Sequence, residues 1–298
     1  MENILRFETV SRYNEYNNQK TLYPLVSVID YSKADPSNDS WMFFGLYSVV
    51  LKDVDCGDIR YGKLNYDYQK GTLVFFTPGQ IIGYESHGEY HQPKGMGLVF
   101  HPDLLHGTHL GKHMKDYSFF TYQSNEALHL SEDEKGIVMD CFSKIKFELE
   151  HAIDKHSKNI IVSNIELFLN HVNRFYDRQF ILRERVNSGI LVSFEKLLDD
   201  YFDSENPSAI GLPAVCWCAS QLNLSSNYFG DLVKKHTGKS AQEYIQSKVI
   251  EVAKSKIYDS EKSLSQIANE MGFRYPSSFT RFFKQHVGFT PNEFRNLN

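Results

Sequence analysis

Two short stretches near the carboxyl end carry side chains that can bind the bases and phosphates of DNA. Asparagine can pair with adenine and arginine with guanine through two hydrogen bonds each, and aspartate can accept a hydrogen bond from cytosine. Hydroxyls and lysines suit phosphate oxygens. The candidate DNA-binding residues are Ser226, Asn227, Asp231, Lys234 and Lys235 in the first stretch and Arg274, Tyr275, Ser277, Ser278, Arg281 and Lys284 in the second. Since a solvated helix surface carries the same residue types, the elements that position them decide between the two interpretations.

An internal repeat with a period of about fifty residues places both stretches in equivalent settings. Each copy has an alanine, apolar residues three and five positions later, and then a cluster of aromatic and aliphatic residues. The two sets are Ala219, Leu222, Leu224, Phe229, Leu232 and Val233, and Ala268, Met271, Phe273, Phe279, Phe282 and Phe283. A small alanine lets a second helix cross closely, and the apolar pair flanks a short turn. The repeat therefore predicts two helix-turn-helix units, with Gly272 at the reversal of the second.

Each copy is followed by residues that are typical of a helix start. These residues mark the limits of the segment between the two copies. Ser240 and Glu243 form a capping box, Thr290 precedes a proline at a first helical position, and Ser263 opens the second unit. Between the copies, Ala241 to about Tyr258 has the apolar spacing of one continuous helix. At about 1.5 Å per residue it spans roughly 25 Å, which is comparable to the ~34 Å turn of B-DNA. Two second helices held this way could enter successive major grooves.

The charge is divided unevenly along the chain. The net charge of the whole sequence is −5, from 32 basic and 37 acidic residues. From Pro207 to the end there are 11 basic and 7 acidic residues, a net of +4, which leaves 21 basic and 30 acidic residues, a net of −9, before it. A basic module attached to an acidic one fits a DNA-contacting surface on a domain with another task.

The remaining chemistry-bearing residues favour no enzyme class strongly. The sequence lacks the common hydrolase, phosphate-loop and dinucleotide motifs. Six histidines fall within one stretch: His87, His91, His101, His106, His109 and His113. They leave open a metal-binding enzyme as the rival class, although their spacing, among glycines and prolines, is more typical of a loop. The four cysteines are scattered and match neither a zinc knuckle nor a redox pair, so we expect reduced thiols.

Within the first two thirds of the chain, the residue pattern changes from strand-like to helix-like near Ser131. Short strands are expected over Leu25–Asp30, Phe43–Leu51, Thr72–Thr77, Gly97–Phe100 and Tyr117–Tyr122, as in a β-sandwich or barrel. A capping box at Ser131 then opens a helix, and two further helices are expected at about Asn159–Tyr176 and Leu182–Tyr201. The polar segment Asp203–Ser208 is the best candidate for a linker. Neither a basic, apolar leader nor eighteen consecutive apolar residues occur, which predicts a cytoplasmic protein.

Residues from about Gly211 to Arg295 resemble the tandem helix-turn-helix domain of the AraC/XylS family of bacterial transcription regulators. The most specific match is SQIANEMGFRYPSSFTRFFK, residues 265–284, followed by GFTPNEFR, residues 288–295. The first unit, LSSNYFGDLVKKHTGKS over residues 224–240, is similar as well. Gly230 and Asp231 depart from the family's pattern, because longer or basic side chains often contact bases there. The first unit is therefore expected to discriminate sequences less than the second.

The resemblance implies a promoter-binding regulator that acts as a homodimer. A small-molecule effector and RNA polymerase are possible partners, and we expect no cofactor or metal. It also implies an α+β, multidomain fold. We expect a cupin-like β-barrel sensor domain over residues 1–130, a helical dimerisation or connector region over 131–203, and the tandem helix-turn-helix domain over 204–298. The stretch GTLVFFTPG, residues 71–79, is similar to a strand and turn of such sensors. The alternative is a cupin-type metalloenzyme with an appended helix-turn-helix domain.

Overall fold

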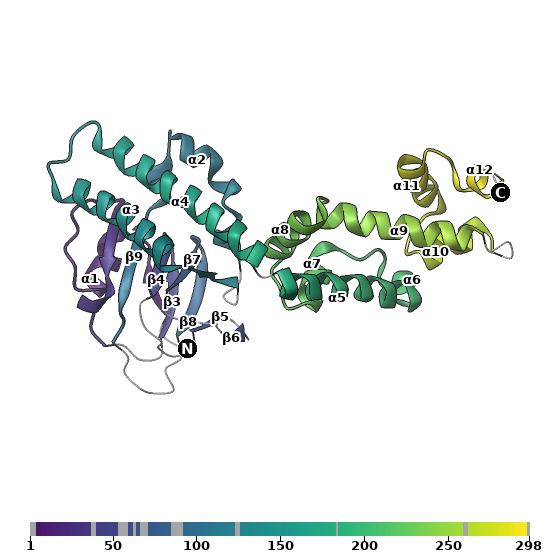
Figure 1. Ribbon diagram of the computed structural model, residues 1–298, viewed down its shortest axis with the longest axis horizontal. Helices are drawn as coiled ribbons and strands as arrows, with labels where there is room; N and C mark the ends of the chain where they lie inside the picture. The colour runs from purple at the N-terminus through teal and green to yellow at the C-terminus, as the bar shows by residue number, and fades with distance from the viewer. Residues whose placement is uncertain are drawn as a thin grey trace. The chain divides into compact units, whose positions relative to one another are not determined.

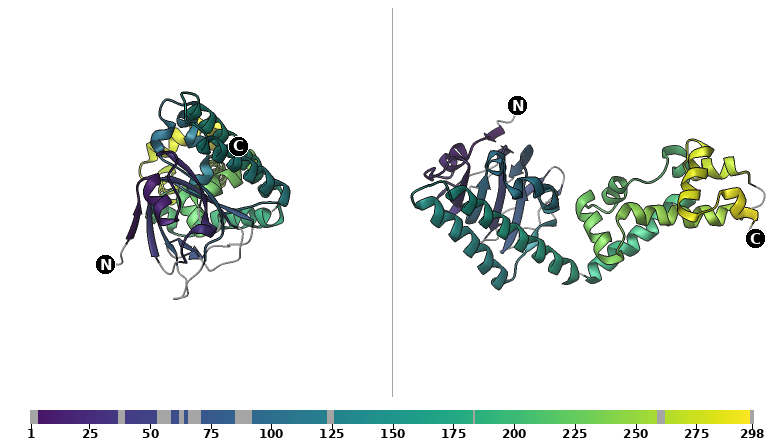
Figure 2. Two further views of the ribbon diagram at one scale, coloured as in Figure 1. Left: turned by 90° about the vertical axis from the view of Figure 1, so that its left-hand side faces the viewer. Right: turned by 90° about the horizontal axis from the view of Figure 1, so that it is seen from above.

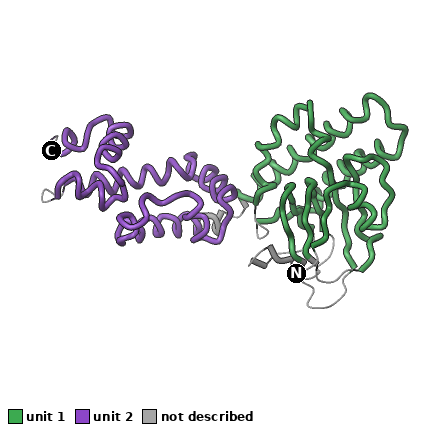
Figure 3. Tube along the Cα trace, turned by 180° about the vertical axis from the view of Figure 1, so that it is seen from behind, with its two compact units in different colours: residues 1–182 green, residues 183–298 purple. Residues whose placement is uncertain are grey.

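The computed structural model describes residues 4–36, 40–52, 59–61, 64–65, 71–84, 92–122, 126–182, 184–258 and 262–296 (Figure 1). The chain divides into two compact units, residues 1–182 and residues 183–298 (Figure 3). Strands and helices share the first unit, and the described elements of the second unit are all helices. The fold is therefore α+β, with a strand-rich amino-terminal part and a helical carboxyl-terminal part.

The first unit contains two sheets of five strands each. The strands are β1 Ile4–Phe7, β2 Val26–Asp30, β3 Ser40–Phe44, β4 Tyr47–Lys52, β5 Ile59–Tyr61, β6 Leu64–Asn65, β7 Thr72–Phe76, β8 Gln80–Tyr84, β9 Gly95–Phe100 and β10 Leu128–His129. One sheet has the order β1-β3-β8-β5-β6, and the other has the order β10-β7-β4-β9-β2. Among the described strands, every pairing is antiparallel except that of β1 with β3. Among the described strands the pairing gives two sheets and no closed barrel, so the barrel remains a prediction.

Aromatic side chains fill both sides of the second sheet. On one side Phe76 stacks on Phe44 of the first sheet, with ring centroids 5.6 Å apart. On the other side Phe75 contacts Phe119 at 4.6 Å, and Phe119 stacks on Tyr176 at 5.7 Å. Every residue of β7 is buried as a result. A strand covered on both faces has a continuous apolar sequence without alternation, as TLVFF does.

Helices cover one face of the second sheet (Figures 1 and 2). The helices of the first unit are α1 Val10–Tyr16, α2 His109–His113, α3 Glu132–Glu150 and α4 Ser157–Leu182, with short 3-10 turns at η1 Tyr31–Lys33, η2 Pro102–Leu105, η3 Met114–Asp116 and η4 Ser118–Thr121. The predicted capping box is present at the start of α3, where Ser131 and Glu134 bond reciprocally. Arg178 of α4 donates to Glu134 and to the His129 carbonyl at 2.7 Å, which ties α4 to the start of α3.

Two strand predictions were wrong. The expected strand Phe43–Leu51 is two strands in different sheets, because the chain crosses between sheets at Gly45, whose N–H donates to the Phe7 carbonyl at 2.8 Å. The expected strand Tyr117–Tyr122 is the 3-10 turn η4, in which the adjacent residues Phe119 and Phe120 are both buried against the sheet. Strand geometry would have placed these two rings on opposite faces.

The second unit is built on one core shared by its helices. These are α5 Glu184–Asp203, α6 Asn206–Ile210, α7 Val215–Gln221, α8 Ser226–Thr237, α9 Ala241–Ile257, α10 Leu264–Glu270, α11 Pro276–Val287 and α12 Pro291–Asn296. The core joins residues from α5 to α11, including Phe194, Phe229, Ile245 and Phe279, none more than 2% exposed. Helix α5 therefore packs with the helices that follow it.

The observed division falls at residue 182 and not at residues 130 and 203. Helices α3 and α4 belong with the sheets, whereas α5 belongs with the carboxyl-terminal helices. The segment predicted to be the linker lies inside the second unit, where Pro207 is buried in the first turn of α6. The roles assigned to the three predicted parts remain predictions. No described helix is long and apolar enough to cross a membrane.

Candidate nucleic-acid interface

Helices α7 and α8 form one helix-turn-helix unit, and α10 and α11 form the other. In each, the residue five positions after the alanine donates its N–H to the carbonyl of that alanine. Leu224 bonds Ala219 at 2.9 Å, and Phe273 bonds Ala268 at 2.9 Å. The same backbone bond at the same step shows that the sequence repeat is a structural repeat.

The turn between the helices needs a left-handed residue in both units. Gly272 has φ +82° in the second unit, which confirms its predicted place at the reversal. Asn223 has φ +55° at the equivalent position of the first unit, four residues after the alanine. Asparagine is among the few residues other than glycine that adopt this conformation readily. Sequence analysis missed the role of Asn223, although its position relative to Ala219 could have revealed it.

The second helix of each unit ends in the same way. Gly238 and Gly288 are left-handed, and their N–H groups donate to the carbonyls of Lys234 and Lys284 at 2.9 Å. The predicted capping box at Ser240 then opens α9. Glu293 and Thr290 bond each other's backbone at 2.7 and 3.2 Å before α12, so the second copy repeats this arrangement.

One face of each second helix is buried. Phe229, Leu232 and Val233 anchor α8, while Phe279 and Phe283 anchor α11. The two helices begin differently. The hydroxyl of Ser225 accepts from the Tyr228 N–H at 3.1 Å at the start of α8, whereas α11 begins with a proline after Tyr275. The remaining face of each helix carries the candidate contact residues.

The candidates on α8 lie off its buried face. Ser226, Asn227, Lys234 and Lys235 are exposed, and Asp231 is half-buried. The two lysines stand in the last turn of the helix, where positive charge also suits the helix dipole. These side chains lie at least partly at the surface of the protein. Whether they contact DNA remains a prediction.

The candidates of the second copy extend from the residues just before α11 to the last turn of that helix. Arg274 and Tyr275 precede the helix, and the guanidinium lies 5.6 Å from the centroid of the Tyr275 ring. Ser277, Arg281 and Lys284 are exposed and Ser278 is half-buried. Within the described ranges, neither Arg281 nor Lys284 forms an ion pair.

Several basic residues that the sequence analysis counted toward a contact surface have structural partners. Lys256 and Lys262 both bind Glu270, at 3.1 and 3.0 Å. Lys248 binds Asp199 at 2.7 Å, and Arg295 donates to backbone carbonyls of the residues at 257 and 262. The basic excess of this region is consequently not all available to an external anion. Lys234 of α8 and Arg281 and Lys284 of α11 are exposed.

The predicted connecting helix is present as α9. Its buried side consists of Ala241, Ile245, Val249, Ala253 and Ile257. It ends at Ile257, one residue before the predicted end, and its 17 residues correspond to about 25 Å. The helix links the end of the first unit to the start of the second and forms part of their common core.

The histidine stretch shows paired side chains and no described metal site. His109 Nδ1 lies 2.8 Å from Glu166, and His113 Nδ1 lies 3.0 Å from Asp116. Among the described residues, no group of three potential ligands could hold a metal ion. His87 and His91 lie outside the described residues.

Comparison with known proteins finds a family match in the carboxyl-terminal part of the chain. Residues 218–297 match the family described as "Helix-turn-helix domain". The matched segment overlaps the residues whose sequence resembles the AraC/XylS domain. It contains both units except for the first turn of α7.

The matching relatives are regulators. The chain is 38% identical over 69 residues to the uncharacterized HTH-type transcriptional regulator YobQ of Bacillus subtilis, covering 23% of this chain and 29% of that protein. It is 26% identical over 146 residues to the probable transcriptional regulator LumQ of Photobacterium leiognathi, covering 49% and 54%. A solved AraC-type regulator from Chromobacterium violaceum matches 37% of this chain and 91% of its own, with 21% identity and a TM-score of 0.32. The chain thus spans 29% and 54% of the length of these two curated relatives.

Proposed function

We propose that the protein is a sequence-specific DNA-binding transcription regulator. The observation that carries this proposal is the duplicated unit, in which two capped helices present polar and basic side chains away from a shared core. Helix-turn-helix domains insert the second helix into the major groove. The regulators among the matched proteins support the same function.

In this proposal each second helix supplies both base and phosphate contacts. Asn227 and Asp231 of α8 and Arg281 of α11 face the bases, because their side chains offer donor and acceptor patterns that distinguish base pairs. Lys234, Lys235 and Lys284 contact phosphates. The remaining candidates, Ser226, Arg274, Tyr275, Ser277 and Ser278, lie at or near the amino-terminal ends of the two helices, where contacts to bases or backbone fit the groove-entry geometry.

The amino-terminal compact unit, residues 1–182, has a different proposed role. We assign two roles to it. It senses a small molecule through a cupin-like arrangement of its two sheets, and it pairs with a second copy of the chain. The two sheets pack on each other through buried aromatic residues such as Phe7, Phe44 and Phe76. An apolar or ring-bearing effector is the class that suits such an interior. On α3 and α4, Phe147 and Leu167 are 62% and 44% exposed, which suits pairing of these helices between copies. An effector would then alter how the paired DNA-binding units are presented to a promoter and to RNA polymerase.

Selection from random duplex DNA with the full-length protein tests this function. We expect enrichment of a sequence with two elements centred about one helical turn, or ~10 base pairs, apart. Binding to the selected duplex should weaken steeply between low and moderate salt, because phosphate contacts release counterions. Equal recovery of all sequences, or binding that does not depend on salt, would overturn the proposal. No described feature favours the metalloenzyme alternative.

A further inference from the structure

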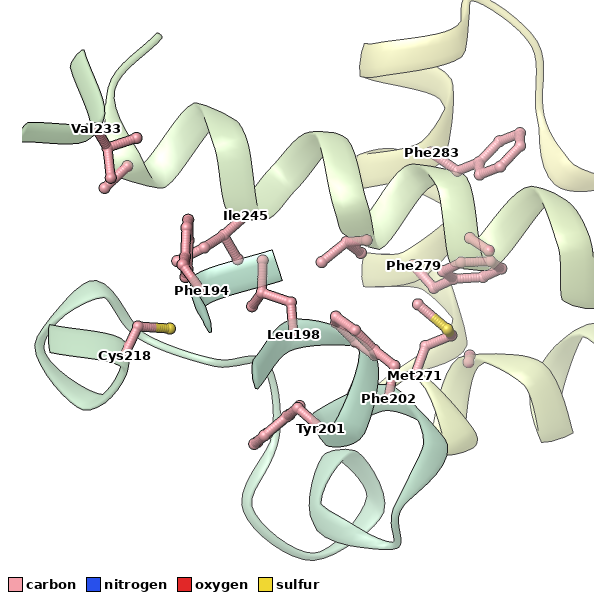
Figure 4. Packing of buried hydrophobic residues seen from close by; sticks show 14 of the residues in the cluster. Phe194, Leu198, Tyr201, Phe202, Cys218, Val233, Ile245, Met271, Phe279 and Phe283 are labelled. Carbon is pink, nitrogen blue, oxygen red and sulfur yellow. The ribbon is translucent and has the colours of Figure 1, made fainter. Parts of the chain in front are cut away.

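Helix α5 and the short helix α6 pack against both helix-turn-helix units. We call Glu184–Asp203 together with Asn206–Gly211 the α5–α6 brace. Phe194, Leu198, Tyr201 and Phe202 of α5 belong to the same buried cluster as residues of both units. Figure 4 shows side chains of α5 extending toward α9, with Phe194 near Ile245. The brace thus accompanies α9 as a second connection between the units.

The brace contacts the first helix-turn-helix unit, α7 and α8, through aromatic side chains. Phe194 packs edge-on against Phe229 of α8, with ring centroids 4.9 Å apart. Tyr201 packs edge-on against Trp217 of α7 at 4.8 Å. Polar bonds add a link to α9, where Lys248 binds Asp199 of α5 at 2.7 Å. Since these groups come from three different helices, they hold α5 in one orientation on the first unit.

At the second helix-turn-helix unit, the brace contacts the turn between α10 and α11. Gly272, the left-handed residue of that turn, lies so close to the end of the brace that an added Cβ would stand 2.7 Å from the Gly211 carbonyl carbon and 2.7 Å from the Pro207 oxygen. Real Cβ atoms essentially never approach backbone atoms so closely. The Ser208 hydroxyl also donates to the carbonyl of Asn269 at 3.4 Å. The backbone of the brace and the backbone of the second turn are therefore in direct contact.

One hydrogen bond connects these two sets of contacts. The Tyr201 hydroxyl donates to the Gly211 carbonyl at 2.8 Å, so the ring that packs on Trp217 also holds the residue that touches Gly272. The Gly211 N–H donates to the Pro207 carbonyl at 2.9 Å and completes the end of α6. A continuous path of contacts runs from the first unit, through Tyr201 and Gly211, to the second turn.

We propose that the α5–α6 brace sets the separation and relative orientation of the two DNA-binding helices, and that Tyr201, Gly211 and Gly272 are its positioning residues. The inference rests on the proposed function for its consequence, which is recognition of two DNA elements at one fixed spacing. A single helix such as α9 joins the units along one line and leaves bending and twisting about that line. A second connection at a separate point opposes both motions.

The repeat itself supplies a variant that tests the contact. Asn223 shows that asparagine is accepted at the left-handed position of such a turn. Gly272→Asn therefore keeps the turn's conformation but inserts a Cβ against Gly211 and Pro207. The matched control is Asn223→Gly, the opposite exchange at the equivalent position of the first unit. Circular dichroism establishes that each variant retains its helices.

The distance between the two second helices can be measured without DNA. Spin labels are placed at Ser226→Cys and Ser277→Cys in the full-length protein, after Cys56 and the exposed Cys216 are replaced by serine. The labelled protein is mixed with an excess of unlabelled protein, so that pairing of copies adds no further distance. We expect one narrow distance distribution, broadened or shifted by Gly272→Asn and unchanged by Asn223→Gly. An unchanged distribution in folded Gly272→Asn overturns the proposal. If that variant fails to fold, Tyr201→Phe replaces it, since it removes only the bond to Gly211, and an unchanged distribution there overturns the proposal equally.

DNA binding provides the second measurement. On the duplex selected by the wild-type protein, we expect Gly272→Asn to bind about tenfold more weakly and to tolerate altered spacing between the two elements, with each element's sequence preference retained. Retained affinity together with the wild-type spacing requirement contradicts the proposal. If the wild-type protein selects no sequence, the proposed function fails, while the label distances still decide whether the brace positions the helices.

Discussion

Asp231 and Arg281 occupy equivalent positions in the two helix-turn-helix units, each seven residues before the glycine that ends its helix. The first unit therefore presents a carboxylate where the second presents a guanidinium. A guanidinium can donate two hydrogen bonds to guanine and also attracts phosphates, whereas a carboxylate can accept from cytosine and is repelled by phosphates. The two units are structural repeats with different preferences at this position.

Replacing Arg281 by alanine should weaken and relax recognition. The side chain is exposed and forms no ion pair within the described parts of the chain, so its donors are available to a guanine. We expect a loss of about 1–3 kcal/mol on the selected duplex and reduced discrimination at one base pair. Fluorescence anisotropy with matched and single-mismatch duplexes measures both. Gln285→Ala, an exposed change on the same helix, serves as the control. An unchanged affinity and salt slope would reject this role.

Replacing Lys284 by alanine should have a different signature. A lysine that contacts a phosphate contributes to affinity for every sequence alike. We expect weaker binding to selected and random duplexes by a similar factor, with a decrease of about 1 in the slope of log affinity against log salt. Titrations at several salt concentrations check this. A change confined to one sequence would show that Lys284 contacts a base.

The helix-turn-helix units could be predicted almost residue by residue because their determinants are local. An alanine, a left-handed turn residue and a helix-ending glycine act within a few positions of one another, and each has a sequence signature. The buried faces of α8 and α11 followed from the same spacing. Even Asn223, which the sequence analysis passed over, stands at a position that the second copy identifies.

Features that depend on distant contacts could not be predicted in this way. The apolar stripe of α5 indicates that it packs, but only the fold shows that Phe194 meets Phe229. The polar, proline-containing segment before Gly211 has a linker's composition, yet Pro207 is buried because the backbone around it packs on the turn at Gly272. In the amino-terminal compact unit, the mostly apolar run from Phe43 to Leu51 conceals the change of sheet at Gly45.

Helix α5 should be essential for the stability of the carboxyl-terminal compact unit, residues 183–298. Phe194 is fully buried among residues of α8 and α9, so Phe194→Ala removes an aromatic ring from a packed core. We expect the free energy of unfolding of this unit to fall by about 3–5 kcal/mol. Val192→Ala on the same helix, where the side chain is 64% exposed, should change it by less than about 0.5 kcal/mol. Urea denaturation of the full-length protein compares them, and equal midpoints for the two variants would contradict the packing of α5.

Stability at acidic pH should depend on Glu270, which bonds Lys256 and Lys262 at the junction of α9 and α10. Burial alone would raise the pKa of this carboxyl, but the hydrogen bonds from the two ammonium groups outweigh it, and the pKa lies below its ordinary value of 4.5. The folded state therefore favours the carboxylate, which stabilises the protein above pH 4.5 and loses that effect as the pH falls through the lowered pKa. We expect Glu270→Gln to melt at a lower temperature than the wild-type protein at pH 7, with the difference shrinking as the pH falls below 4.5. Glu251→Gln, which alters a more exposed ion pair with Lys248, should have a smaller effect at pH 7. A difference at Glu270 that stays constant from pH 7 to well below 4.5 would show that the carboxylate's charge is not what stabilises this junction.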